Sequence, residues 1–295
     1  MHEFRKLNRF IVVGVNGGFS NAISSKIPIL YPSSTLVNIS SREFQTTHFR
    51  DQTEFLLKSQ NLFSDHIIWC SGSSSNRSTH SDCMKDESAL REFFSIFLKR
   101  SKIPFHFSFL SSGGTVYGNF AGVVNEQSEI NPQTAYAEMK IRSENYLKKL
   151  AQDGFITLSI FRLANVYGLN KPSNRMSFVE VALKRKEIFL TVNSQSRKQY
   201  GTYDDYAHYI LNSLRNSYEQ PDNFIVQNIF SDHPYSIDDI LRLTASHNKF
   251  GEDRLIHEPG DCSILETVLL TSTHPAVKFN HNWKSLENYL EGVNF

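Results

Sequence analysis

The sequence has few cysteines, no excess of charge of either sign and no long apolar run, and each shortage excludes a class of protein. Its three cysteines, Cys70, Cys83 and Cys262, are too few and too scattered for a disulfide framework or a paired metal site. Lysines and arginines number 31 against 30 aspartates and glutamates, so no basic field favours nucleic acid or an anionic membrane. We therefore expect no metal site, no nucleic-acid partner and no membrane partner.

The N-terminal segment lacks the features of a targeting signal. Met1–Arg9 is polar, and the apolar run Phe10–Val13 is far too short for the core of a signal peptide or for a membrane span. Together with the small number of cysteines, this predicts a protein of the reducing cytoplasm. A chain of 295 residues is long enough for a large buried core, in one large domain or in two interleaved ones.

The first half of the sequence alternates apolar strands with helical segments. This alternation predicts an α/β fold in which helices cover both faces of a parallel sheet. The expected strands are Phe10–Val13, Thr35–Ile39, His66–Cys70, Pro104–Leu110 and Ile156–Leu163. The expected helices are Asn21–Ser25, Gln52–Leu62, Glu87–Lys99 and Tyr136–Gln152.

A tyrosine and a lysine at helical spacing indicate a proton-transfer site. Tyr136 precedes Lys140 by four residues, so a helix places the ammonium beside the phenol. A free phenol has a pKa near 10, and its use as an acid or base near pH 7 requires roughly 4 kcal/mol of preferential phenolate stabilisation. A nearby cation acts in that direction. Alone, such a pair is also typical of an ordinary amphipathic helix. We expect Asn131 to be the N-cap of this helix, Pro132 to be its first helical residue and Gly154 to terminate it.

Four segments follow one another in an order that carries a family resemblance. An apolar strand runs into the turn Ser111–Gly114, and the helix with the tyrosine and lysine follows. Phe161–Gly168 then resembles an Arg-x-x-Asn-Val-Tyr-Gly strand end. Lys198–Ala207 is similar to an Arg-Asp-Phe-x-x-Val-Asp-Asp-Val-Ala segment, with Lys198 in place of the arginine. With these motifs the chain resembles the extended short-chain dehydrogenase/reductase family, specifically its nucleotide-sugar epimerase, dehydratase and reductase branch.

The resemblance implies a Rossmann-type doubly wound parallel sheet with a smaller C-terminal substrate-binding region. We place the dinucleotide-binding domain at residues 1–166. The mainly substrate-binding region then spans 167–295 and is partly interleaved with the first. Helices of this family often pair in dimers, so the resemblance also suggests a homodimer.

A glycine loop after the first expected strand is the expected site of a dinucleotide pyrophosphate. The loop Gly14–Ser20 lies between a strand and a helix, where backbone N–H groups meet a phosphate. It fits Gly-x-x-Gly-x-x-Gly or Gly-x-x-x-Gly-x-Gly, with Ser20 in place of the last glycine, and an ordinary glycine turn is the alternative. Ser71–Ser75 is either a flexible loop or, as the resemblance implies, begins with the turn that passes under the dinucleotide.

The end of the second expected strand favours NADP over NAD. An acidic residue there binds the adenosine ribose and repels a 2'-phosphate, but this chain has Ser40, Ser41 and Arg42. Arg42 is expected to hold the 2'-phosphate, with the two serines as neutral donors. If Arg42 is instead a solvated surface residue, NAD remains the alternative. The candidate cofactor-binding residues are Gly14, Gly17, Gly18, Phe19, Ser40, Ser41, Arg42, Ser71, Gly72, Tyr136, Lys140 and Leu163.

The reaction is less defined than the family. Enzymes of this branch usually carry a catalytic hydroxyl three residues before the valine of Val-Tyr-Gly, and that position is Gly113 here. Either Ser112 or Thr115 replaces it, or the tyrosine works with a water; Ser111 and Ser112 are alternatively plain turn residues. In an extended chain Thr115 faces the same side as Gly113, which favours Thr115. Related 4,6-dehydratases carry an Asp-Glu pair here, and its absence disfavours dehydration.

The resemblance leaves three functions open. The first, which the missing acidic selector for NAD favours, is reduction of a 4-keto-6-deoxy sugar nucleotide by NADPH. Tyr136 then protonates the alkoxide, and Lys140 holds the cofactor ribose. The second is 4-epimerisation with a tightly bound dinucleotide, and the third is a dinucleotide sensor without catalysis. The expected partner is a nucleotide-diphosphate sugar. The candidates near its diphosphate are Asn165, Arg175, Arg197 and Lys198, of which the two arginines are alternatively solvated charges.

Overall fold

The computed structural model describes eleven segments of the chain. These are residues 7–14, 16–40, 63–99, 105–118, 122–168, 176–190, 192–214, 223–248, 255–257, 268–273 and 285–292. The expected helix Gln52–Leu62 and the candidate residues Ser41, Arg42 and Arg175 lie outside the described residues.

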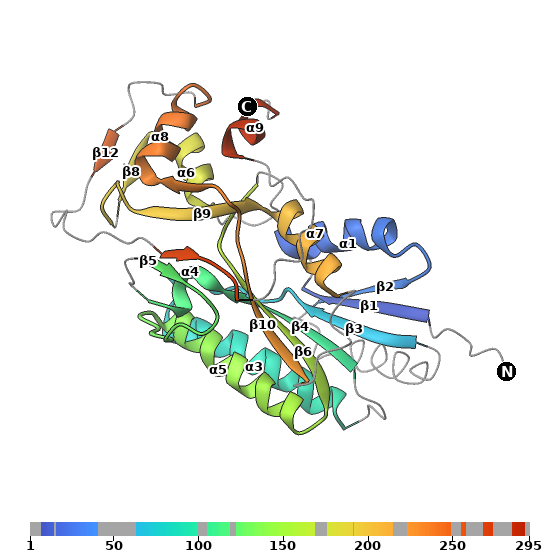
Figure 1. Ribbon diagram of the computed structural model, residues 1–295. Helices are drawn as coiled ribbons and strands as arrows, with labels where there is room; N and C mark the ends of the chain where they lie inside the picture. Colours follow the sequence, from blue (N-terminus) through green and yellow to red (C-terminus); the bar gives the residue numbers. More distant parts are fainter. Residues whose placement is uncertain are drawn as a thin grey trace.

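A six-stranded parallel sheet forms the centre of the molecule (Figure 1), with the strand order β10–β6–β4–β3–β1–β2. Its strands are β1 (Leu7–Val13), β2 (Thr35–Ile39), β3 (Phe63–Trp69), β4 (Phe105–Ser112), β6 (Ile156–Leu163) and β10 (Phe224–Ile229). The chain reverses its direction of winding at β1, which lies between β2 and β3. In such sheets ligands bind at this switch point, outside the carboxyl ends of the strands. The α/β, Rossmann-type prediction is confirmed.

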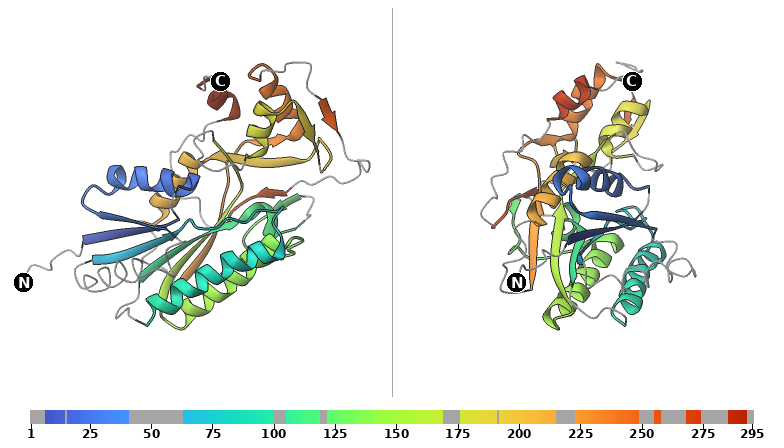
Figure 2. Two further views of the ribbon diagram at one scale, coloured as in Figure 1. Left: turned by 180° about the vertical axis from the view of Figure 1, so that it is seen from behind. Right: turned by 90° about the vertical axis from the view of Figure 1, so that its right-hand side faces the viewer.

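Helices cover both faces of this sheet, as the burial of a parallel sheet requires. The pair α3 (His80–Phe97) and α5 (Ala135–Gln152) packs on one face, and the pair α1 (Gly18–Leu30) and α7 (Tyr203–Leu214) packs on the other (Figure 1, Figure 2). Because alternate residues of a strand share a face, Phe105, Phe107 and Phe109 of β4 all point toward α3 and α5. The sheet therefore lies between two apolar cores.

The smaller lobe is built from the remaining elements, and three of them are the next elements after strands of the central sheet. At their carboxyl ends β4 leads into α4 (Gly113–Val116), β6 into β7 (Asn165–Tyr167) and β10 into β11 (Pro234–Ser236). The second sheet has the order β11–β9–β13–β5, and β7 also pairs with β9. The other elements are β5 (Gly122–Val124), α6 (Phe178–Lys184), β8 (Glu187–Phe189), β9 (Arg197–Thr202), α8 (Ile237–Ala245), β12 (Leu255–His257), β13 (Val268–Leu270) and α9 (Leu286–Glu291).

Two elements of the C-terminal part of the chain return to the central sheet. Helix α7 covers one face of that sheet, and β10 pairs with β6 at its edge. The apolar core of the smaller lobe lies instead among α6, α8 and α9. The domain boundary near residue 166 stays a prediction. No described helix is both long and apolar enough to cross a membrane.

Most predicted elements are present, with differences at their ends. Strands β2 and β6 have the predicted bounds. Helix α1 is longer than the predicted Asn21–Ser25 and continues through Pro28, because Ile23 and Ile27 are buried against the sheet and hold the last turns in place. Helix α3 begins before the predicted Glu87, since the Thr79 side chain accepts the N–H of Asp82 (3.2 Å) and caps an earlier turn.

The start of α5 differs from the prediction. Its N-cap is Thr134 rather than Asn131, and the Thr134 Oγ1 accepts the N–H of Ala137 (3.1 Å). The N–H of Asn131 is instead donated to the carbonyl of Val116 in α4 (3.0 Å), which holds that residue outside the helix. The end of the helix agrees with the prediction, because Gly154 follows it with a left-handed φ of +79°.

Candidate active site

Tyr136 and Lys140 lie in the first turns of α5, on one face of the helix. The Lys140 Nζ is 5.5 Å from the centre of the Tyr136 ring and donates a hydrogen bond to the carbonyl oxygen of Leu110 in β4 (2.9 Å). Lys140 is 8% exposed, and burial lowers its pKa to about 8 although nearby carboxylates oppose the effect. The pair therefore combines a half-buried phenol with an ammonium that stays mostly charged at pH 7.

A buried ion pair, which the sequence analysis did not identify, supports the end of β4. Glu144 of α5 binds Arg162 of β6 through two hydrogen bonds, of 2.7 and 3.1 Å. Burial alone would lower the pKa of Arg162, but its hydrogen bonds to Glu144 raise it. Ser111 donates to Glu144 (2.6 Å), and Arg162 donates to the Tyr117 hydroxyl (2.9 Å). Ser111 therefore has a structural role. The sequence did contain a signal for Glu144 as a residue of this site, because Glu144 stands one turn after Lys140 on the same helix face.

The segment after β4 becomes helical rather than staying extended, which overturns the geometric argument for Thr115. Residues two apart in a helix point to opposite sides, so Thr115 does not face the side of Gly113. The Thr115 hydroxyl is nevertheless buried and has no hydrogen-bond partner among the described residues. Ser112 is half-buried, and its side chain makes no capping bond to α4. Both remain candidate hydroxyl donors.

The glycine loop approaches the loop after β3 at the switch point of the sheet. Gly14 has a φ of +119°, and a Cβ on it would lie 3.0 Å from the backbone nitrogen of Ser71, so only glycine fits. Gly17 is the N-cap of α1, and its N–H is accepted by the Ser20 hydroxyl (3.0 Å). Gly72 also turns with a positive φ, of +150°. These loops place backbone and a helix N-terminus around one point, which fits a dinucleotide pyrophosphate.

Gly18 has a different role, because an aromatic ring covers it. A Cβ on Gly18 would lie 2.6 Å from two ring atoms of Tyr203, the first residue of α7. The Tyr203 ring also makes an edge contact with Phe19, with centroids 4.8 Å apart, and lies against Gly168. Tyr203, which the sequence analysis did not single out, therefore joins the glycine loop to the end of β7.

The remaining candidates lie on several elements. Ser40 follows β2 and is half-buried, and Leu163 at the end of β6 is buried in the core that α1 and α7 cover. Asn165 begins β7, beside Gly114, and its amide donates to the carbonyl of Gln199 (3.3 Å). On β9, Lys198 is half-buried, whereas Arg197 is exposed and donates to the carbonyl of Pro234 (3.1 Å).

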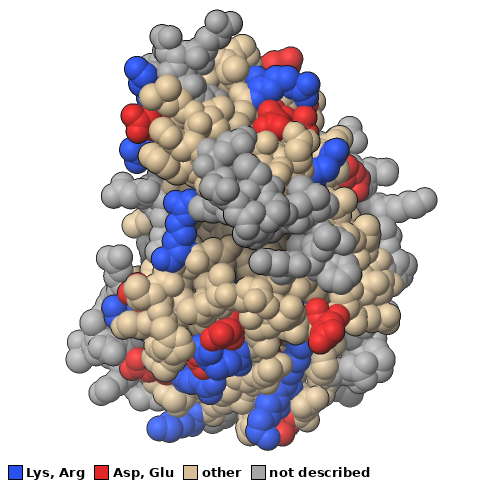
Figure 3. Space-filling view, turned by 90° about the vertical axis from the view of Figure 1, so that its left-hand side faces the viewer, with Lys and Arg blue, Asp and Glu red and all other residues tan. Residues whose placement is uncertain are grey.

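Charges of both signs are mixed on one face of the molecule. On the face shown in Figure 3, lysines and arginines are interspersed with aspartates and glutamates rather than gathered in one area. Within the segments that the structure describes, no group of three or more His, Cys, Asp or Glu is arranged to hold a metal ion.

Comparison with known families gives one match. The model of the NAD dependent epimerase/dehydratase family matches residues 28–227. This range contains the Tyr136 and Lys140 pair, and both motifs that follow it, but begins after the glycine loop. No curated protein matches the chain.

Several solved structures have a similar fold. UDP-glucose 4-epimerase from Thermotoga maritima, in complex with UDP-glucose, is 18% identical with a TM-score of 0.74, and 96% of each chain is covered. MoeE5 in complex with UDP-glucose and NAD is 13% identical with a TM-score of 0.75, again over 96% of each chain. The dTDP-glucose 4,6-dehydratase from Bacillus anthracis, in complex with NAD, is 12% identical with a TM-score of 0.70, over 96% of this chain and 94% of that one. At these identities the likeness is one of fold.

Proposed function

Because the chain belongs to the NAD dependent epimerase/dehydratase family, we propose that it is an NADP(H)-dependent oxidoreductase that reduces a 4-keto-6-deoxy sugar nucleotide. The observation that carries this proposal is the half-buried Tyr136 beside the buried Lys140. Their helix packs beside α3, whose Asp86 binds the loop after β3. The proposed substrate is a nucleotide-diphosphate sugar, the class of molecule bound in the T. maritima and MoeE5 structures. The described candidates for contacts with its diphosphate are Asn165, Arg197 and Lys198.

The loops of this chain fit a dinucleotide. Gly14 and Gly72 allow close backbone approach, and the first turn of α1 presents N–H groups that have no partner within the helix. Ser71 lies against Gly14, so both loops would contact the same ligand. When bound, the nicotinamide supplies the hydride for the reduction.

In this proposal Tyr136 is the proton donor and Lys140 is its electrostatic support. The phenol gives its proton to the oxygen on C4 as that atom becomes an alkoxide. The Lys140 cation favours the phenolate that remains. Since the pKa of Lys140 is about 8, most molecules carry this charge at pH 7, and the bond to the Leu110 carbonyl fixes its position.

Epimerisation at C4 is the second candidate. Two observations favour it: UDP-glucose 4-epimerase is among the proteins of similar fold, and the MoeE5 structure holds NAD. A retained dinucleotide would accept the hydride from C4 and return it to the opposite face, with no consumable reductant. A dinucleotide sensor is the third, since Gly113 carries no hydroxyl.

Purified protein distinguishes these functions. We expect it to consume NADPH with a 4-keto-6-deoxy sugar nucleotide and to release little dinucleotide when denatured. Tyr136→Phe is the control, and it should lower turnover by at least about 100-fold while dinucleotide affinity stays nearly unchanged. Stoichiometric NAD in the denatured protein, without NADPH consumption, would favour the epimerase. Dinucleotide binding without turnover of either kind would favour the sensor.

A further inference from the structure

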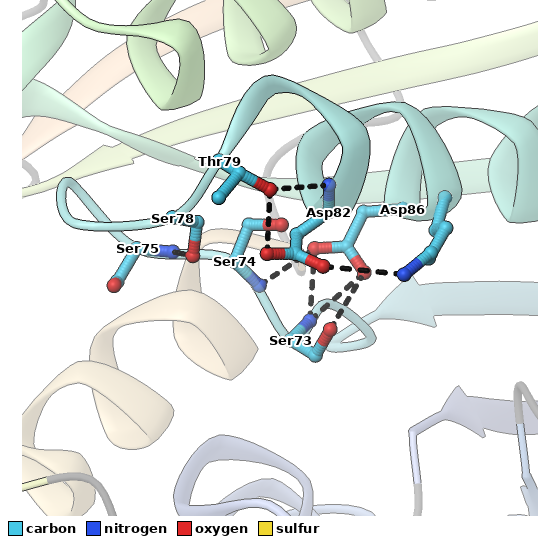
Figure 4. A network of polar contacts seen from close by, with 8 residues as sticks. Ser73, Ser74, Ser75, Ser78, Thr79, Asp82 and Asp86 are labelled. Atoms are coloured by element: carbon cyan, nitrogen blue, oxygen red, sulfur yellow. Dashed lines mark hydrogen bonds and ion pairs between the residues drawn. The ribbon is translucent and has the colours of Figure 1, made fainter.

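One carboxylate holds the loop that follows β3. Both oxygens of Asp86 accept the N–H of Ser73 (2.9 and 2.8 Å), and Oδ2 also accepts the N–H of Ser74 (2.7 Å). The Ser73 hydroxyl donates to Oδ1 (3.3 Å). Figure 4 shows the Asp86 side chain pointing from α3 toward these serines. The backbone immediately after Ser71 and Gly72 is therefore fixed by a side chain of the neighbouring helix.

The same part of α3 is locked against the helix that carries Lys140. Glu87, the residue after Asp86, accepts a hydrogen bond from Arg142 of α5 (2.9 Å). Arg142 lies two residues after Lys140. This ion pair therefore joins the two helices near Lys140. Burial lowers the pKa of Lys140, and several nearby groups act in the opposite direction. Of these groups, the Asp86 carboxylate has the largest effect.

The groups around Lys140 differ in whether they carry a negative charge that can balance its ammonium. Helix α3 contributes Asp86 and the thiol of Cys83, and α5 contributes Glu144 and the Tyr136 phenol. Within its described residues, β4 contributes a backbone carbonyl and an aromatic ring, which are both uncharged. Glu144 shares its charge with Arg162 at 2.7 Å, whereas the donors to Asp86 among the described residues are uncharged N–H and O–H groups. The negative charge of Asp86 is therefore left to act on Lys140.

We propose that Asp86 is a positioning residue of the dinucleotide site, which fixes the backbone of Ser73 and Ser74 and balances the charge of Lys140. The inference rests on the proposed function, because a dinucleotide would lie over this loop and beside this lysine. A carboxylate that accepts several hydrogen bonds is preorganised, so the loop backbone is held in place before a ligand binds. The position of the loop and the charge balance at Lys140 then both depend on the Asp86 side chain.

Asp86→Asn tests the charge, and Asp82→Asn is the matched control. Asp82 lies one turn earlier on α3 and binds Thr79 (2.8 Å) and Lys85 (3.2 Å) instead of the loop. The titration of Lys140 is followed by NMR of protein with 15N-labelled lysine, without dinucleotide. We expect the midpoint of wild type and Asp82→Asn near pH 8 and that of Asp86→Asn lower by about 1 pH unit. An unchanged midpoint in Asp86→Asn would overturn the charge role.

Dinucleotide titrations of the same proteins test the positioning role. Asp86→Asn is expected to weaken NADP and NAD alike by about tenfold, while Asp82→Asn binds as wild type. Asp86→Glu keeps the charge, so its Lys140 should titrate with the wild-type midpoint. This variant also replaces Asp86→Asn in the binding test if Asp86→Asn does not fold. Wild-type affinity in a variant with a shifted midpoint would overturn the positioning role. If wild type binds no dinucleotide, the proposed function fails, while the Lys140 midpoint still decides whether Asp86 balances its charge.

Discussion

A side chain at Gly113 would collide with Leu270. A Cβ at this position would lie 2.5 Å from Cδ1 of Leu270 and 3.0 Å from the carbonyl oxygen of Arg162. Leu270 belongs to β13, is 2% exposed and packs with Val116 and Tyr117. The smaller lobe thus fills the space next to the position where related enzymes carry a hydroxyl. A side chain at this position would therefore require Leu270 to move.

Gly113→Ser is expected to lower the free energy of unfolding by about 1 to 3 kcal/mol, because overpacking displaces neighbouring groups. Leu270→Ala should lower it by about 2 to 5 kcal/mol through the cavity that it leaves. The double variant should lose less than the sum of both, since the smaller side chain makes room for the serine. Urea denaturation of the four proteins measures this coupling. Simple additivity would mean that the Arg162 carbonyl, not Leu270, limits the position.

Thr115→Val is expected to separate stability from activity. The buried Thr115 hydroxyl has no partner among the described residues, so its replacement by a methyl group should leave thermal stability unchanged or slightly higher. If this hydroxyl donates to the reacting oxygen, its loss costs about 2.7 to 4 kcal/mol of transition-state stabilisation, or about 100-fold or more in turnover. Ser112→Ala should cost less than about tenfold by comparison. Turnover at saturating substrate decides, and the reverse order would pass the role to Ser112.

Arg42→Ala is expected to weaken NADP binding while sparing NAD. A charge-assisted contact to the 2'-phosphate contributes about 1.5 to 3 kcal/mol, which corresponds to roughly a ten- to hundredfold loss of affinity. Titration of both dinucleotides against the variant measures the difference. Equal losses for the two, or none, would make Arg42 a solvated surface residue and reopen the choice of cofactor.

Two buried histidines are expected to make the fold sensitive to acid. The rings of His66 in β3 and His106 in β4 lie 5.8 Å apart, and burial lowers the pKa of His66 to about 4 and that of His106 to about 3. The charge of His66 adds to the effect on His106. In the unfolded chain both have a pKa near 6.5, so below that pH the unfolded state binds protons that the folded state does not. Stability should then fall with decreasing pH, by about 1.4 kcal/mol per unit for each histidine.

Urea midpoints between pH 7 and 4.5 measure this loss, in a window above the ordinary pKa of most carboxylates. His66→Phe is a suitable variant, because His66 already stacks on Phe10 with centroids 4.7 Å apart. It should reduce the pH dependence to about half that of the wild type, since one of the two histidines remains. The same slope in the variant and the wild type would assign the acid sensitivity to other groups.

Local sequence determined the elements whose pattern needs no distant partner. The strands β2 and β6 have the predicted bounds because each is a continuous apolar or alternating run between turn residues. Tyr136 and Lys140 share a face because helical spacing alone places them there. The order of strands and helices likewise predicted the parallel sheet, since each helix must cross over it.

Tertiary structure decided the features that join distant segments. Leu270 meets Gly113, Tyr203 covers Gly18, and Asp86 holds the loop after β3, although no local pattern relates these positions. The orientation of Thr115 was mispredicted because the segment after β4 forms a helix there instead of staying extended. Periodicity is a property of neighbouring residues. Which side chain fills the space beside a glycine, or which charge lies next to a buried lysine, depends on how the two lobes and both helical layers pack, and only the folded chain brings those atoms together.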